Sequence, residues 1–215
     1  MRFLVVHAHP LRDSFNRALF ELTHDTLSAC GHEVEGLDLY AAGFDPVLDA
    51  EGRRRYHDRG ANARPVAAEL ERLKRANGLI FVYPTWWYAQ PALLKGWLDR
   101  VLVPHVCFRM PEPGRPIGPR LTHIQVLGGI ATYGAPWWFT RWVGDPGRRI
   151  LMRGIKPLMH PRCRSFWCAL HRMDSVSAAA REAFKARVRR RLERLPVEVA
   201  DVPVRMGDQA LWSEA

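Results

Sequence analysis

The sequence has little cysteine and lacks an apolar segment suited to a membrane helix. Its four cysteines among 215 residues form no Cys-x-x-Cys pair, which favours a reducing compartment. One uncharged stretch, residues 76–94, is 19 residues long, but Gly78, Pro84, Gln90 and Pro91 divide it into a strand, a loop and a helix. Nothing at the amino end resembles a signal peptide. We therefore expect a cytoplasmic protein.

The composition also excludes extensive disorder and fibrous repeats. Hydrophobic residues make up 47% of the chain and charged residues 25%, as in an ordinary globular protein. A length of 215 residues predicts one domain, which we place at residues 1–195. Residues 196–215 contain two prolines and little periodicity, so we expect them to form a C-terminal tail.

Lysine is scarce, because 28 of the 32 basic residues are arginine, and the formal net charge is +10. Residues 141–194 contain 15 basic and 4 acidic residues, a net +11, so the rest of the chain sums to −1. An arginine-rich region of this kind is either a solvated surface or a face that meets an anion. The sequence leaves both interpretations open.

Short apolar runs alternate with helical patterns along the chain. The predicted strands are residues 3–7, 33–39, 78–83, 121–128 and 164–170, and the predicted helices are residues 15–29, 65–76, 91–103 and 177–195. Residues 41–64 predict a loop. Apolar strands that alternate with helices indicate a parallel sheet covered on both faces. We predict a flavodoxin-like, doubly wound α/β fold with strand order 2-1-3-4-5, which binds ligands at the carboxyl ends of its strands.

The loop after the first strand carries His9, Asp13, Ser14 and Asn16. A helix that begins here offers unpaired amides and a positive dipole end, and Ser14 and Asn16 complete a seat for a phosphate. The alternative is that Asp13 or Ser14 only caps the helix. Asp13 would repel a phosphate unless it points away or is offset by a neighbouring cation. His7 and His9 share a strand face, but no further ligands at metal-binding spacing accompany them, so we expect no metal site.

Aromatic residues follow the third predicted strand and glycines follow the fourth. Trp86, Trp87 and Tyr88 are costly to leave exposed, and they fit either a core or dimer plug or a wall for a flat ring. Gly128 and Gly129 would let the backbone approach a ligand, although a plain turn needs glycine equally often. Because the loops after strands one, three and four meet at one edge of the sheet, we predict that they form a single crevice.

Two segments carry a resemblance to a known family. One is His9-Pro10 with the downstream residues Ser14, Phe15, Asn16 and Ala18, and the other is residues 84–101, PTWWYAQPALLKGWLDRV. Together they resemble the NAD(P)H:quinone oxidoreductase family of flavodoxin-like flavoproteins, over about residues 2–195. That family includes mammalian quinone reductases and the ancillary subunits of bacterial glutathione-gated potassium efflux systems. The resemblance implies a tightly bound flavin, FMN or FAD with FMN favoured, and two-electron, ping-pong hydride transfer from NAD(P)H to quinones or similar acceptors.

The resemblance also implies roles for residues in all three loops. The implied cofactor-binding residues are His9, Ser14, Phe15, Asn16, Ala18, Pro84, Thr85, Trp86, Trp87, Tyr88, Gly128, Gly129 and Tyr133. Tyr133 is also the implied catalytic residue, because it looks like the family tyrosine that hydrogen-bonds the flavin edge. The mammalian enzymes have a histidine six residues later, where this chain has Phe139, so Tyr133 and backbone donors would have to balance the charge. The substrate-binding candidates are Trp87, Tyr88, Trp137 and Phe139, and the cluster at residues 136–142 is alternatively a subunit contact.

The family usually forms homodimers, and we expect the same here. Arginines of the basic segment would clamp the 2′-phosphate of NADPH, with a solvated helix face as the alternative for residues 187–194. A second possible function is that of a regulatory subunit docked on a potassium efflux transporter, with residual reductase activity and a basic surface that meets an anionic partner. A one-electron carrier is disfavoured, because such carriers are usually acidic and lack the aromatic wall. No recognition-helix or zinc-finger spacing supports nucleic-acid binding.

Overall fold

Five parallel strands form the central sheet of the computed structural model, which describes residues 1–114 and 116–199. Their order across the sheet is β2-β1-β3-β6-β7. The strands are β1 (Arg2–His7), β2 (Glu33–Asp38), β3 (Gly78–Pro84), β6 (Val126–Thr132) and β7 (Arg164–Leu170). Counted along the chain, this is the order 2-1-3-4-5 that the sequence predicts, so the flavodoxin-like topology is confirmed.

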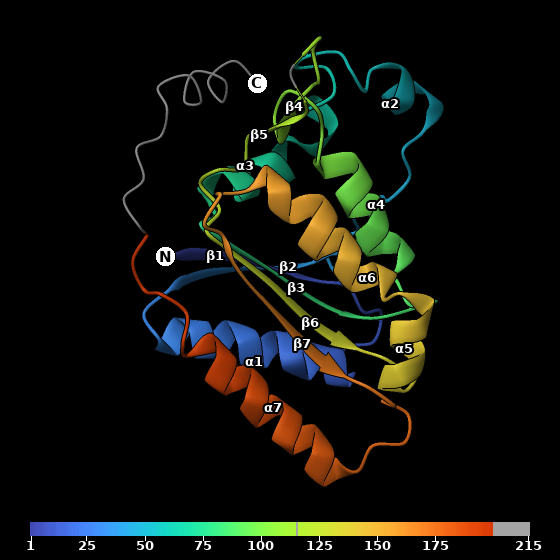
Figure 1. Ribbon diagram of the computed structural model, residues 1–215, viewed down its shortest axis with the longest axis vertical. Helices are drawn as coiled ribbons and strands as arrows, with labels where there is room; N and C mark the ends of the chain where they lie inside the picture. The colour runs from blue at the N-terminus through green and yellow to red at the C-terminus, as the bar shows by residue number, and fades with distance from the viewer. Residues whose placement is uncertain (115, 200–215) are drawn as a thin grey trace.

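Helices cover both faces of the sheet (Figure 1). On one face lie α1 (Phe15–Ala29) and α7 (Ala178–Leu192), and on the other lie α3 (Ala67–Arg75), α4 (Ala92–Val101) and α6 (Pro146–Arg149). Successive strand side chains point to opposite faces. In β1, Phe3 and Val5 therefore pack in the hydrophobic cluster of α1 and α7, whereas Leu4 and Val6 pack in the cluster of α3 and α4.

Local sequence signals set the helix boundaries. Ser14 caps α1, where its Oγ accepts a hydrogen bond from the Arg17 amide at 3.1 Å, and Ser177 caps α7 in the same way. The prediction for α1 is confirmed at both ends. The predicted final helix is longer than α7, which ends at Leu192. Pro91 directly precedes the first residue of α4. The fixed φ of proline suits this position at the entry to a helix.

The predicted fourth strand, residues 121–128, is wrong, because β6 runs from Val126 to Thr132. Gly128 and Gly129 therefore lie inside the sheet, so their predicted placement in a loop after the strand is wrong, and their implied contact with a cofactor stays a prediction. They pair with Phe166 and Trp167 of β7, and the rings of these two residues fill the space where a glycine Cβ would stand. A Cβ at Gly128 would lie 2.3 Å from the Phe166 ring, and one at Gly129 would lie 2.0 Å from the Trp167 ring. The paired glycines make room for aromatic neighbours.

The sequence analysis did not predict several short elements. The predicted loop at residues 41–64 contains α2 (Ala50–Arg54) and reaches into η1 (Arg64–Val66). A small antiparallel ladder joins β4 (Phe108–Arg109) to β5 (Gly118–Pro119). Between β6 and β7 lie α5 (Trp137–Val143), α6, the π-helical η2 (Ile150–Ile155) and η3 (Lys156–Leu158). Most of the predicted tail, residues 200–215, lies outside the described residues, so the domain boundary stays a prediction. Among the helices described, none is long and apolar enough to cross a bilayer.

The close packing of Gly129 against Trp167 generates a stability prediction. Replacing Gly129 with alanine places a methyl group against the indole, and overpacking of this kind costs about 1–3 kcal/mol. The free energy of unfolding, measured by urea titration, should fall by that amount. Gly154→Ala is the matched control, since no atom lies within 4 Å of its added Cβ, and it should leave stability unchanged or slightly raised. Equal stability of the two variants would contradict this account of the glycine pair.

Candidate functional site

The loops after β1, β3 and β6 meet at the carboxyl edge of the sheet. Pro84 at the end of β3 pairs with Thr132 at the end of β6. The Thr85 amide donates to the Thr132 carbonyl at 2.8 Å. The Asn16 Nδ2, near the start of α1, donates to the Thr132 Oγ1 at 2.7 Å. These bonds bring together three segments that are far apart in the sequence, as the crevice prediction requires.

A hollow of about 210 Å³ lies where the segments after β3 and β6 face each other. It is lined by residues 85, 87 and 88 on one side and by residues 133–135 on the other. Thr85, Trp87, Tyr88 and Tyr133 are predicted site residues, whereas Gly134 and Ala135 were not singled out. Their position directly after a strand end was the signal that would have found them.

The aromatic wall is a tight turn in a strained conformation. Trp86 and Ala89 exchange two backbone hydrogen bonds, at 3.2 and 3.1 Å, across a two-residue turn. The residues between them, Trp87 and Tyr88, have φ angles of +49° and +63°. This left-handed region normally belongs to glycine or asparagine in turns of this type. Trp87 is 91% exposed, so burial of its ring does not explain the strain. Outliers of this kind cluster at functional sites.

The segment after β6 holds this turn from the side. The Gly147 amide donates to the Tyr88 carbonyl at 3.1 Å, and the buried Gln90 Nε2 donates to the Gly147 carbonyl at 2.8 Å. The rings of Tyr88 and Phe139 lie 5.8 Å apart. Phe139, a predicted substrate-binding residue, therefore contacts the aromatic wall. Trp137 is on the same short helix, α5, and is 62% exposed.

The Tyr133 hydroxyl, which the resemblance implies at the flavin edge, bonds to an internal carboxylate in this structure, and its catalytic role stays a prediction. The residue is buried, and its hydroxyl donates to Asp145 Oδ1 at 2.9 Å. Burial raises the pKa of this phenol far above its usual value, and the negative charge of Asp145 raises it further. The hydroxyl is thus committed to an internal carboxylate, and Tyr133 is not a free proton donor. Sequence reasoning missed Asp145, because a single aspartate before a proline looks like an ordinary helix start.

The predicted phosphate-binding loop is only partly assembled as expected. Asn16 is 4% exposed, and its Oδ1 has no hydrogen-bond partner among the described residues, which is an unusual state for a buried polar atom. Ser14 is half-buried at the start of α1, and Asp13 is exposed. His9 is half-buried and its Nδ1 accepts from the Leu11 amide at 3.1 Å, while burial lowers the pKa of its imidazole.

Two predicted cofactor-binding residues in the first turn of α1 face away from the cleft. The Phe15 ring packs towards Phe184 of α7, at a centroid distance of 6.4 Å. Ala18 lines a separate hollow between α1 and α7. The Ala18 side chain thus faces α7 in this structure, and its implied role in cofactor binding stays a prediction.

The histidine pair does not form a shared binding site in this structure. His7 is fully buried, stacks on the Phe20 ring at 4.9 Å, and has its Nδ1 3.2 Å from the Val82 carbonyl oxygen. Within residues 1–114 and 116–199, no group of three or more His, Cys, Asp or Glu side chains is placed to hold a metal ion.

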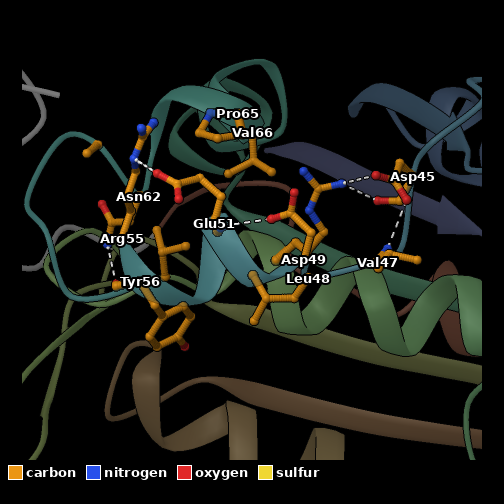
Figure 2. A pocket seen from close by; sticks show the side chains of 14 residues that line it. Asp45, Val47, Leu48, Asp49, Glu51, Arg55, Tyr56, Asn62, Pro65 and Val66 are labelled. Atoms are coloured by element: carbon orange, nitrogen blue, oxygen red, sulfur yellow. Dashed lines mark hydrogen bonds and ion pairs between the residues drawn. The ribbon is translucent and has the colours of Figure 1, made fainter.

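A second cavity, of about 200 Å³, lies between α2, η1 and α4 (Figure 2). Its charged side chains already have partners within the protein. Asp45 pairs with Arg100 at 3.2 Å, and Glu51 pairs with Arg55 at 2.6 Å. Asp49 caps α2, since its Oδ1 accepts from the Gly52 amide at 2.7 Å. These bonds order the long connection after β2, and the predicted site residues lie elsewhere.

Two arginines of the basic segment pack along the sheet. The Arg187 and Arg191 guanidinium groups lie over the rings of Phe184 and Phe166, at 4.8 and 5.2 Å, and both donate to backbone carbonyls of β7. Among the described residues, none of the arginines lines the hollow at the strand ends. A clamp for the 2′-phosphate of NADPH therefore stays a prediction.

Comparison with known proteins finds relatives that are named as NAD(P)H oxidoreductases. The chain is 36% identical to rat NAD(P)H dehydrogenase [quinone] 1 over 118 residues, which cover 47% of this chain and 43% of the rat protein. It is 34% identical to an uncharacterised NAD(P)H oxidoreductase of Escherichia coli over 101 residues, which cover 46% of this chain and 52% of that one. The chain thus spans about half the length of these relatives.

Solved structures match nearly the whole chain. The NAD(P)H:quinone oxidoreductase from Methanothermobacter marburgensis superimposes with a TM-score of 0.76 at 28% identity, covering 91% of this chain and 99% of that one. A Bacillus anthracis FMN-dependent NADH-azoreductase, solved with FMN, shares the fold with a TM-score of 0.72 at 14% identity, covering 90% of this chain and 98% of that one. Residues 1–152, well over half of the chain, match the model of a family described by its flavodoxin-like fold, and the chain belongs to that family.

Proposed function

We propose that the protein is a flavin-dependent NAD(P)H oxidoreductase that passes two electrons to a quinone or a similar flat acceptor. The observation that carries this proposal is the open hollow at the ends of β3 and β6, with the exposed Trp87 ring held in a strained turn on one side. The quinone oxidoreductases among its relatives support the same reaction class.

The residues present fit a flavin. The unpartnered Asn16 Oδ1 is a buried acceptor beside the start of α1 and awaits a donor such as a sugar hydroxyl. The start of α1 offers backbone amides that suit a phosphate, although the Arg17 amide already donates to Ser14 Oγ. Trp87 and Tyr88 would flank the ring system. When bound, the flavin supplies the redox chemistry, and the protein supplies position and electrostatics.

Backbone hydrogen bonds hold the loop after β6, which lines one side of the cleft. The Met173 amide donates to the Tyr133 carbonyl at 2.9 Å, and the Arg172 amide donates to the Ala135 carbonyl at 3.3 Å. The loop that follows β6 is thus held by the segment after β7 before any ligand binds. Donors and dipoles that are held in advance need no reorganisation during the reaction, which is the main electrostatic advantage of an enzyme site.

The test of the proposal is flavin content and turnover. The purified full chain should be yellow, or should take up FMN or FAD added to it, and should oxidise NADPH or NADH when menadione is supplied. Heat release and mass measurement identify the flavin, and parallel assays identify the nucleotide. A colourless protein that binds neither flavin would overturn the proposed function.

Trp87 should affect the reaction without affecting stability. Because its side chain is 91% exposed, Trp87→Ala should leave the thermal midpoint within 2 °C, a shift of about 0.5 kcal/mol or less. Because the variant loses one aromatic contact with the acceptor, kcat/KM for menadione should fall by about tenfold. Steady-state kinetics check this outcome. Trp87→Phe should recover part of the loss, and unchanged kinetics in both variants would remove Trp87 from the site.

We also propose that a second copy of the chain covers the exposed indoles near the cleft. Trp137, Trp138 and Trp142 of α5 are 62%, 60% and 77% exposed, a concentration of apolar surface that soluble monomers rarely leave uncovered. Light scattering should give the mass of a dimer, and Trp142→Glu should weaken association at least tenfold. Val47→Glu, at a position that is 61% exposed and precedes α2, should not weaken association. A monomer at all concentrations would contradict this assignment.

A further inference from the structure

Asp145 is a buried carboxylate that does not cap the helix it precedes. It stands at the N-cap of α6 and is 7% exposed, yet its side chain accepts no hydrogen bond from the backbone amides of that helix. Its φ of +48° lies in the left-handed region. Its Oδ1 instead accepts from the Tyr133 hydroxyl and its Oδ2 from Arg148 Nε, both at 2.9 Å. A buried charge is costly unless it is paired. Capping therefore does not explain this residue, whereas a link to Tyr133 does.

Tyr133 is held on its ring as well as at its hydroxyl. The His171 ring stacks on it at a centroid distance of 4.6 Å and an angle of 25°. The hydroxyl bond to Asp145 then fixes the remaining freedom of the side chain. Because Tyr133 begins the loop that lines the hollow through residue 135, Asp145 sets the position of that wall.

Gly147, two residues after Asp145, holds the opposite wall. Its amide and carbonyl bond to Tyr88 and Gln90, as described above. A Cβ on Gly147 would lie 3.2 Å from the Tyr88 carbonyl oxygen and 3.3 Å from the Ala89 Cα. The backbone of α6 therefore touches the turn directly, with no room for a side chain between them.

We propose that Asp145 and Gly147 are positioning residues that fix the separation of the two cleft walls. Within one turn of backbone, this segment bonds to the loop after β6 through Asp145 and to the turn after β3 through Gly147. The proposal rests on the proposed function, since the walls matter because a flavin and a flat acceptor lie between them. It concerns residues that touch the walls and not the reacting atoms.

Three variants test the Asp145 half. Tyr133→Phe removes the hydrogen bond and keeps the charge, Asp145→Asn removes the charge, and the third variant combines both changes. Each variant weakens a hydrogen bond to a buried charge, so we expect the dissociation constant for FMN to rise at least tenfold in each. Fluorescence quenching on the apoprotein measures this constant. The double variant should bind FMN no more weakly than the weaker of the two single variants, because both substitutions remove the same interaction between Tyr133 and Asp145. The menadione KM should rise more than kcat falls.

Gly147→Ala tests the other half and does not disturb Asp145. The added methyl pushes the Tyr88 carbonyl, so the menadione KM should rise several-fold, although alanine favours helix. Hydrogen exchange of the Trp86 and Ala89 amides should accelerate in all four variants, with or without flavin. Circular dichroism and thermal midpoints establish that each variant is folded. If a variant fails to fold, the folded ones still decide the question.

Asp174→Asn is the matched control. Asp174 is exposed and lies beside Gly134, which belongs to the loop after β6. The asparagine substitution therefore removes one negative charge near that loop without touching α6. It should stay within twofold of the unaltered protein in FMN affinity and KM. If the Asp145, Tyr133 and Gly147 variants behave like this control, the inference is overturned. If the unaltered chain binds no flavin but the exchange rates change as expected, the proposed function fails and the positioning role stands.

Discussion

The candidate site depends on the hydrogen bonds of one residue, Thr132. Its carbonyl accepts from the Thr85 amide and its hydroxyl accepts from Asn16, so three loops are joined where β6 ends. Thr132 is 3% exposed, and its carbonyl also accepts from the Thr85 hydroxyl at 3.1 Å, so these bonds form in a site largely closed to water. Parallel pairing of β3 with β6 brings Thr132 beside Pro84, and sheet register thereby sets the geometry of the cleft.

Periodicity and capping signals predicted α1, α3, α4, α7 and most strand boundaries, because these features depend on local sequence. The sheet order followed from the alternation of strands and helices. The fourth strand was misplaced for a reason that local sequence does not contain. Gly128 and Gly129 resemble a turn until their neighbours on β7 are known, since the space they leave is filled by Phe166 and Trp167. Cross-strand packing depends on register, and register is a property of the folded sheet.

The same distinction applies to the site. The loops after β1, β3 and β6 were predictable from the rule that ligands bind at strand ends. The segment at residues 145–147 was not, because its contacts with Tyr133, Tyr88 and Gln90 arise from tertiary packing alone. The direction of a side chain was equally hidden. Tyr133 and Ala18 occupy the expected elements, yet one hydroxyl bonds to an internal carboxylate and the other side chain faces α7.

The aromatic turn shows how function outranks local preference in this chain. Glycine at positions 87 and 88 would adopt positive φ without strain, whereas two aromatic residues in that region cost about 1 kcal/mol or more each. Hydrogen bonds from Gly147 and ring contact with Phe139 offset part of that cost. A glycine turn would be more stable but would present no ring to a ligand. In the proposed function, this strain has a purpose, because the exposed ring of Trp87 forms a wall that is in place before a flat molecule arrives.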